Sequence, residues 1–166
     1  MEEYINLKHT FEPVWNKNSK VLVLGTFPSV KSREYGFYYG HPQNRFWKVA
    51  AAITGQDIPA TTEDKKKLLL GNNIALWDVI ASCSIKGSSD SSIKDVTPNN
   101  LIPLLDGSSI TRIYANGAKA YELYMKYSYE KTGMEIIKLP STSPANAVYT
   151  LEKLIAAWNN IKIIAH

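Results

Sequence analysis

The sequence contains few of the residues that build metal centres and covalent cross-links. Its 166 residues include one cysteine, Cys83, and three histidines, His9, His41 and His166. A lone cysteine excludes an intrachain disulfide, a cysteine-rich zinc site and an iron–sulfur cluster. The histidines are far apart in the sequence and lack the spacing of metal ligands. We therefore expect no metal ion and no cofactor.

Long hydrophobic segments and nucleotide-binding glycine loops are also absent. No run approaches the roughly 18 apolar residues that a membrane-spanning helix needs. The first residues, MEEYINLKHT, are acidic and lack the apolar region of a secretory signal. Neither G-x-G-x-x-G nor G-K-S/T occurs, which weakens the case for a small-molecule nucleotide binder or hydrolase. We expect a soluble, intracellular (cytoplasmic) protein that makes no membrane contact.

The composition is that of an ordinary globular protein. Hydrophobic residues make up 45% of the chain and charged residues 20%. The length favours one domain over residues 1–166, which we expect to be a monomer. Nineteen basic residues against fifteen acidic ones give a net charge of +4. This mild excess is compatible with a polyanionic partner.

Four apolar runs predict the strands of a sheet. KVLVLG (20–25), NIALWDVI (73–80), TRIYANG (111–117) and MEIIKLPS (134–141) are nearly continuous in their apolar character, which is typical of buried parallel strands. Helical patterns cover residues 42–55, 61–71, 97–105, 118–133 and 145–160, with Thr97 as a predicted N-cap. The alternation predicts an α/β fold, a three-layer α/β/α sandwich with a central four-stranded parallel sheet. The serine-rich residues 82–95 favour a surface loop.

Polar loops follow all four predicted strands. Gly25 and Pro28 indicate an abrupt turn after the first strand, Asp78 follows the second, and Asn116 ends the third. The fourth leads into LPSTSPANA, where serines and a helix N-terminus would suit a phosphate. Because ligands bind outside the carboxyl ends of parallel strands, we predict a site at this edge.

The segment GFYYGHPQNRFWKV (36–49) gives the strongest functional signal. Three adjacent rings, Phe37 to Tyr39, cost solubility on a surface unless they bind something. Together with GTFPSVKSREY before it and STSPANAVYTLEKL later in the chain, the segment resembles the uracil-DNA glycosylase superfamily. The string HPxNRFWK is similar to the mismatch-specific uracil/thymine branch. The fuller string, followed by LWDVIASCSIKGSSDSSI, most resembles the DNA-deoxyinosine (hypoxanthine-DNA) glycosylase branch over about residues 20–160.

The resemblance implies an enzyme that flips a deaminated base out of double-stranded DNA and hydrolyses its N-glycosidic bond. The product is an abasic site in base excision repair, with hypoxanthine the favoured base and uracil a second candidate. No lysine in the motif strings stands where Schiff-base chemistry would need it, so we expect no lyase activity. The implied base-binding residues are Gly25, Thr26, Phe27, Tyr38, Tyr39 and Ser141, with the ring of Tyr38 or Tyr39 stacking on the base.

Two residues are candidates for positioning the water. Relatives often carry Asp or Asn in the first loop where this chain has Phe27, which cannot orient a water. Asn44 offers an acceptor and two donors, although it could instead cap the helix that follows. Asp78 stands where relatives often present an Asn that reads the base. It could accept from a purine N–H, polarise the water or cap a turn. We take Asn44 and Asp78 as the catalytic candidates and His41 as a loop anchor.

The remaining predictions concern DNA contacts. Ser141 replaces a histidine that relatives often use on the leaving base, so backbone amides would have to assist its departure. Ala145 and Asn146 fall where relatives insert a wedge into the duplex. Phe27 and Ser141 also support an alternative, a nucleic-acid-binding member that has lost its chemistry. The predicted DNA-binding residues, whose contacts would make binding salt-dependent, are Ser29, Lys31, Arg33, Lys86, Ser88, Ser89, Ser143, Pro144, Ala145 and Asn146.

Overall fold

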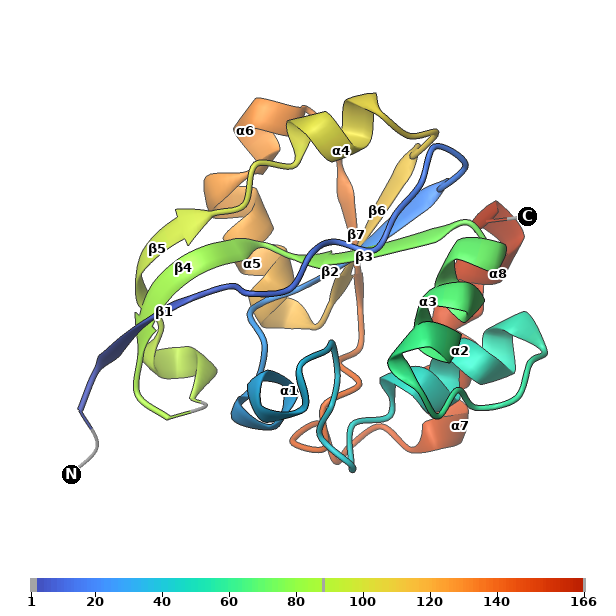
Figure 1. Cartoon of the computed structure of the whole chain (residues 1–166), viewed down its shortest axis with the longest axis horizontal. Helices are drawn as coiled ribbons and strands as arrows, with labels where there is room; N and C mark the ends of the chain where they lie inside the picture. Colours follow the sequence, from blue (N-terminus) through green and yellow to red (C-terminus); the bar gives the residue numbers. More distant parts are fainter. Residues whose placement is uncertain (1–2, 88, 166) are drawn as a thin grey trace.

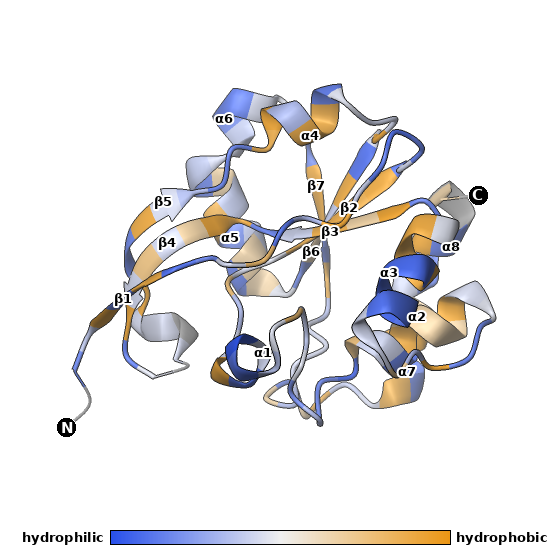
Figure 2. Cartoon of the chain, in the orientation of Figure 1, coloured by the Kyte–Doolittle hydropathy of each residue, from blue (hydrophilic) through white to orange (hydrophobic). Residues whose placement is uncertain are grey.

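A parallel sheet of four strands forms the centre of the computed structural model, which describes residues 3–87 and 89–165. The strands are β2 (Val21–Gly25), β3 (Ile74–Asp78), β6 (Arg112–Asn116) and β7 (Ile136–Leu139). They lie in the order β3-β2-β6-β7, and each neighbouring pair is parallel (Figure 1). All five residues of β2 are buried, and β2 and β3 are mostly hydrophobic in Figure 2. The four apolar runs therefore predicted the sheet correctly.

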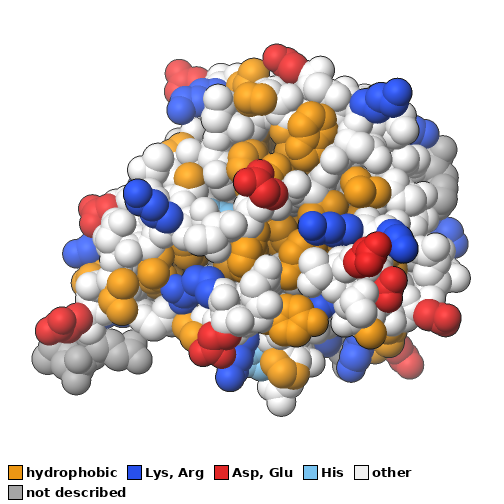
Figure 3. All heavy atoms as spheres, in the orientation of Figure 1, with side chains coloured by type: hydrophobic (Ala, Val, Ile, Leu, Met, Phe, Trp, Pro, Cys, Tyr) orange, Lys and Arg blue, Asp and Glu red, His pale blue; other side chains and the backbone are white. Residues whose placement is uncertain are grey.

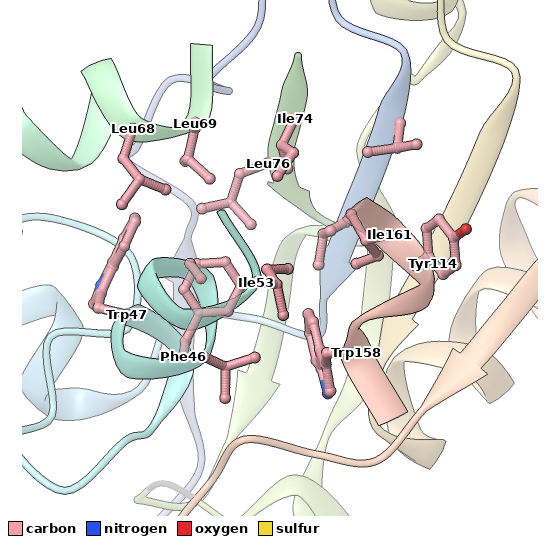
Figure 4. Packing of buried hydrophobic residues seen from close by; sticks show 14 of the residues in the cluster. Phe46, Trp47, Ile53, Leu68, Leu69, Ile74, Leu76, Tyr114, Trp158 and Ile161 are labelled. Carbon is pink, nitrogen blue, oxygen red and sulfur yellow. The ribbon is translucent and has the colours of Figure 1, made fainter. Parts of the chain in front are cut away.

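Helices cover both faces of this sheet. The residues of β2 alternate between the faces, with Val21 and Val23 on one and Leu22 and Leu24 on the other. The first face packs against α2 (Phe46–Thr54), α3 (Thr62–Gly71), α7 (Leu151–Trp158) and α8 (Asn160–Ala165), whose buried side chains meet in Figure 4. The second face packs against α4 (Ile102–Asp106), α5 (Ala118–Tyr127) and α6 (Tyr129–Thr132). The three-layer prediction is confirmed.

A second, antiparallel sheet was missed by the sequence analysis. It consists of β1 (Ile5–Lys8), β4 (Ile80–Ile85) and β5 (Lys94–Pro98) in the order β1-β4-β5, with the 3₁₀ turn Asp90–Ser92 between the last two. The predicted loop over 82–95 is therefore wrong at its two ends, which belong to β4 and β5, whereas residues 86–87 and 89–93 do connect the strands. The N-cap at Thr97 is also wrong, because Thr97 pairs with Ser82. Register shifts interrupt the β4–β5 ladder, so the buried residues of β4 do not alternate regularly. This irregularity concealed the strand.

Four predicted helices also differ in their boundaries, and the one expected over 97–105 begins at Ile102. The helix expected from residue 42 begins at Phe46, and the one expected over 118–133 breaks at Ser128 into α5 and α6. The helix expected from residue 145 begins at Leu151, where the Thr150 hydroxyl accepts a hydrogen bond from the Lys153 N–H. Residues 141–150 form an irregular loop instead, which places no helix N-terminus after Ser143. Within the described ranges, no helix is long and apolar enough to cross a membrane.

Candidate active site

A cleft of about 540 Å³ lies at the carboxyl edge of the parallel sheet. Each strand contributes a residue at or just past its end: Gly25 from β2, Asp78 from β3, Asn116 from β6 and Ser141 after β7. The loops that enclose the cleft, with the short helix α1 (Val30–Tyr35), gather below the sheet in Figure 1. The cleft lies at the edge of the sheet where the sequence analysis predicts a site.

The hydroxyl groups of two serines stabilise the loop after β2. Ser29 caps α1, and its Oγ accepts a hydrogen bond of 3.1 Å from the Ser32 N–H. The Ser32 hydroxyl oxygen in turn accepts from the Gly40 N–H at 2.9 Å. This chain of contacts fixes Thr26 and Phe27, both partly exposed to the cleft, relative to the segment 36–45.

The adjacent rings of that segment are largely buried. Phe37 is 4% and Tyr38 2% exposed, and the Tyr38 hydroxyl donates to the Glu12 carbonyl at 3.0 Å. The ring of Tyr39 stacks on Phe46, with centroids 4.2 Å apart. Both tyrosines line the cleft. Packing against the core thus explains how the chain tolerates three rings in a row.

Asn44 joins the start of α2 to the loop after β7. Its Oδ1 accepts hydrogen bonds from the Phe46 N–H at 2.9 Å and from the Thr142 hydroxyl at 2.8 Å. Asn44 thus holds the N–H of the first residue of α2, although Arg45 and not Asn44 occupies the N-cap position of that helix. Among the described residues its Nδ2 group makes no hydrogen bond, and the residue lines the cleft. One end of the amide is fixed, and the other can donate to a ligand.

Arg45 organises the loop of residues 141–150, a role that the sequence analysis missed. Its guanidinium donates to the carbonyls of Ser143 at 2.8 Å and Asn146 at 3.0 Å, and also to that of Tyr149. These carbonyls point inward to a charged donor rather than along a helix. The one feature of the sequence that could have indicated this role is the position of Arg45 next to Asn44 in the motif HPQNRFWK.

Thr142 and Asn116 form a pair of hydrogen bonds that the sequence analysis did not predict. The Thr142 N–H donates to Asn116 Oδ1, and Asn116 Nδ2 donates to the Thr142 hydroxyl oxygen, both at 3.0 Å. Thr142 is fully buried. The neighbouring Ser141 hydroxyl accepts from the Ser143 N–H at 3.1 Å. The β6 and β7 ends are thereby locked together beneath the cleft.

Asp78 is paired with a histidine from the N-terminal segment. Asp78 Oδ2 lies 2.7 Å from His9 Nε2, and the two side chains are 6% and 3% exposed. His9 Nδ1 accepts from the Phe11 N–H at 3.1 Å, so the ring proton is on Nε2 and is donated to the carboxylate. No pattern in the sequence indicates this contact between residues 69 positions apart.

Gly25 leaves room for two polar groups at the floor of the cleft. A Cβ atom at this position would collide with Asp78 Oδ1 and lie 3.0 Å from the Tyr39 hydroxyl. Burial and the nearby Asp78 carboxylate raise the pKa of Tyr39, whereas the Asn116 side chain lowers it to a smaller extent. The Tyr39 hydroxyl therefore remains protonated and can donate.

The predicted DNA-binding residues fall into two groups. Ser29, Lys31, Arg33, Ser143, Pro144 and Ala145 line the cleft, whereas Asn146 lines an adjoining hollow and donates to the Ser141 carbonyl at 3.0 Å. Lys86, with its Nζ 4.7 Å from the Tyr4 ring centroid, and Ser89 are not among the residues that line the cleft. Ser88 lies outside the described residues. Figure 3 shows basic and acidic side chains interspersed over one face.

Comparisons with known proteins agree with this architecture. The model of the uracil DNA glycosylase superfamily matches residues 12–162. A hypoxanthine DNA glycosylase of Methanosarcina acetivorans is 36% identical over 144 residues, which cover 84% of this chain and 89% of the relative. One of Methanosarcina barkeri is 34% identical over 143 residues, covering 84% and 88%.

A solved structure agrees as well. The solution NMR structure of a Methanosarcina acetivorans protein described as a uracil DNA glycosylase superposes with a TM-score of 0.82 at 33% identity. The match covers 98% of this chain and all of that one. Fold and sequence together define a DNA N-glycosylase. The chain belongs to the uracil DNA glycosylase superfamily, as its motif strings predicted.

Proposed function

We propose that this protein is a monofunctional DNA glycosylase that excises deaminated bases, hypoxanthine in preference to uracil. The observation that carries the proposal is the cleft at the sheet edge, where Asn44, Asp78 and Tyr39 converge. The names of the two Methanosarcina relatives support hypoxanthine as the base. The substrate is double-stranded DNA, from which the damaged nucleotide is flipped into the cleft.

Hydrolysis of the N-glycosidic bond passes through an oxocarbenium-like sugar and needs a positioned water more than a strong nucleophile. Because Asn44 Oδ1 is occupied by Phe46 and Thr142, its Nδ2 is the group that holds the water, as a donor to the water oxygen. The carboxylate of Asp78 adds negative charge near the developing cation. Asn44 thus positions the water without acting as a base.

Ser141 stands where relatives often carry a histidine, so other donors would have to stabilise the departing base at that position. Ser141 lies at the cleft, and so do the residues of the turn after β2, Thr26 and Phe27. Hydroxyl and backbone N–H donors of this kind stabilise negative charge that develops on a leaving group. Phe27 adds a partly exposed ring to the wall formed by Tyr38 and Tyr39. Tyr38 is 2% exposed, so Phe27 and Tyr39, both partly exposed, are the rings that would supply a stacking face for the flipped base.

The rim of the cleft would hold the DNA backbone. Ser29, Arg33 and Ser143 lie along it, and the loop that carries Ser143 is braced by Arg45. Lys31 lies at the rim as well but pairs with Glu34 at 3.5 Å, both side chains being exposed. The loop of residues 141–150 also exposes Val148, which is 80% accessible and lies three residues beyond Ala145, the predicted wedge position.

The test uses duplex oligonucleotides that contain inosine, uracil, xanthine or a thymine mismatch. Incubation followed by alkali should cleave the inosine duplex fastest, and omission of alkali should leave all strands intact. Cleavage without alkali would contradict the monofunctional assignment, and cleavage of uracil alone would contradict the base preference. Tight, salt-dependent binding of inosine DNA without any cleavage would favour the inactive nucleic-acid-binding alternative.

A further inference from the structure

The antiparallel sheet of β1, β4 and β5 extends to one side of the parallel sheet in Figure 1, and its two faces differ in chemistry. Leu7, Cys83 and Ile85 pack in the hydrophobic cluster on the second face of the parallel sheet. Because side chains alternate along a strand, the residues between them point to the opposite face. There Asn6 Nδ2 donates to Ser84 Oγ at 3.4 Å, and the two residues are register partners. This outer face of the antiparallel sheet is therefore polar.

Three lysines lie on the outer face. Lys8 is the register partner of Ser82, and Lys94 is that of Ser84, so the lysine side chains are on the same face as these serines. Lys86 directly follows β4, two residues beyond Ser84. Among the residues that the structure describes, none of the three lysines forms an ion pair with a carboxylate. Three positive charges on this face are thus available to an anionic partner.

Tyr4 holds two of these ammonium groups close together. The Nζ atoms of Lys94 and Lys86 lie 3.8 Å and 4.7 Å from the centroid of its ring, and the residue is 41% exposed. The negative face of an aromatic ring attracts cations and so offsets part of the repulsion between the two lysines. The nearby residues Glu3 and Asp95 are exposed, and their carboxylates form no ion pair with either lysine. Two clustered positive charges at the surface suit a phosphate group.

The outer face continues from the rim of the cleft. Ile85, the residue before Lys86, lines the cleft together with residues 30–33 of α1. Strand β4 follows β3, which is one edge of the parallel sheet, whereas the loop of residues 141–150 follows β7 at the other edge. The lysines of the outer face therefore lie beyond one side of the cleft, away from that loop.

We propose that the outer face, through Tyr4, Lys8, Lys86 and Lys94, binds the phosphate backbone of duplex DNA on one side of the flipped nucleotide. The inference rests on the proposed function, which places that nucleotide in the cleft. At about 3.3 Å per residue, Lys8 is roughly 13 Å from Tyr4 along β1. This is the length of about four base pairs. DNA is the substrate of the superfamily, and its dense negative charge complements lysines that have no carboxylate partner.

The test replaces all three lysines with glutamine and measures DNA binding by fluorescence anisotropy. The ligand is a duplex with 2′-fluoro-2′-deoxyinosine, whose fluorine slows cleavage by destabilising the oxocarbenium-like state. Each phosphate contact contributes about 0.9 to the slope of log K against log salt, so the slope on a long duplex should become shallower by about 2–3 units. The single-turnover cleavage rate of inosine DNA at saturating protein should not change, because the cleft is intact.

Two shortened duplexes locate the contact. Each has about three base pairs on one side of the lesion and about 15 on the other, and the two differ in which side is short. The triple variant should bind one of them more weakly than the unaltered protein does, and the other equally well, because the outer face lies beyond one side of the cleft. Equal losses on both duplexes, or no loss on either, would overturn the inference.

Two further variants separate a local contact from an effect of net charge. Lys17→Gln, Lys67→Gln and Lys162→Gln together remove the same charge from exposed residues outside the cleft lining and the antiparallel sheet, and they should leave the slope unchanged. Substitution of the three outer-face lysines by arginine should preserve the slope of the unaltered protein. A control variant that loses as much slope as the test variant would contradict the inference. An unaltered protein that binds DNA but cleaves no deaminated base would instead contradict the proposed function.

Discussion

Asn44 Oδ1 accepts a hydrogen bond of 2.8 Å from the hydroxyl of Thr142, a residue 98 positions later in the chain. This contact joins the two motif strings and fixes the orientation of an amide that also accepts a hydrogen bond from the N–H of Phe46, the first residue of α2. Asn44→Ala should therefore lower the single-turnover rate on inosine DNA about 100-fold or more. Loss of the hydrogen bond to the Phe46 N–H should cost about 1 kcal/mol in the free energy of unfolding. A folded Asn44→Ala protein with full activity would remove this residue from catalysis.

Thr142→Val tests the same contact from the other side. It removes the hydroxyl that holds Asn44 and also a partner of Asn116. We expect a smaller loss of activity, about 10-fold, because the Phe46 N–H still orients the Asn44 amide. A loss as large as that of Asn44→Ala would indicate that Thr142 itself contacts the substrate.

Arg45→Lys should loosen the loop of residues 141–150. A lysine keeps the charge but cannot reach the carbonyls of Ser143, Asn146 and Tyr149 with one ammonium group. We expect a loss of about 2–4 kcal/mol in unfolding free energy, measured by urea denaturation, from carbonyls left without their donor. Lys48→Gln, an exposed change on the same helix, is the control and should have little effect. An unchanged denaturation midpoint for Arg45→Lys would contradict the bracing role.

Gly25→Ala and Gly71→Ala form a matched pair. At Gly25 the new Cβ would collide with Asp78 Oδ1, which should destabilise the protein by about 1–3 kcal/mol and remove most of the activity. At Gly71, the last residue of α3, no atom lies within 4 Å of a new Cβ. That change should leave activity intact and stabilise the helix by up to about 1 kcal/mol. Thermal denaturation and the inosine cleavage assay measure both effects.

Arg33→Ala should reduce the salt dependence of DNA binding. If Arg33 contacts a phosphate, the slope of log K against log salt should become shallower by about one unit. Lys67→Ala, on α3 and paired with Glu63 at 3.6 Å, should leave the slope unchanged. The two slopes are compared by fluorescence anisotropy titrations at salt concentrations between about 50 and 200 mM. Equal slopes for both variants would remove Arg33 from the interface.

The sequence predicted the central sheet because its strands are buried on both faces and read as continuous apolar runs. It could not predict β4, whose bulged pairing breaks the alternation and whose serines suggested a loop. The false helix start at residue 145 has a similar cause. The carbonyls of Ser143 and Asn146 accept hydrogen bonds from Arg45, about 100 positions away, and local helix propensity cannot predict that contact. Asn44 and Asp78 were predicted from motifs, whereas His9 depends on tertiary structure alone.

The position of His9 has a consequence for the behaviour of the protein on warming. His9 directly follows β1, an outer strand whose residues are mostly exposed, and among the described strands β1 pairs with β4 alone. Edge strands of this kind open at lower temperatures than the core. Detachment of β1 would withdraw the anchor of Asp78 while the parallel sheet, the cleft and Asn44 stay in place. Warming would then change the surroundings of the Asp78 carboxylate before the rest of the cleft unfolds.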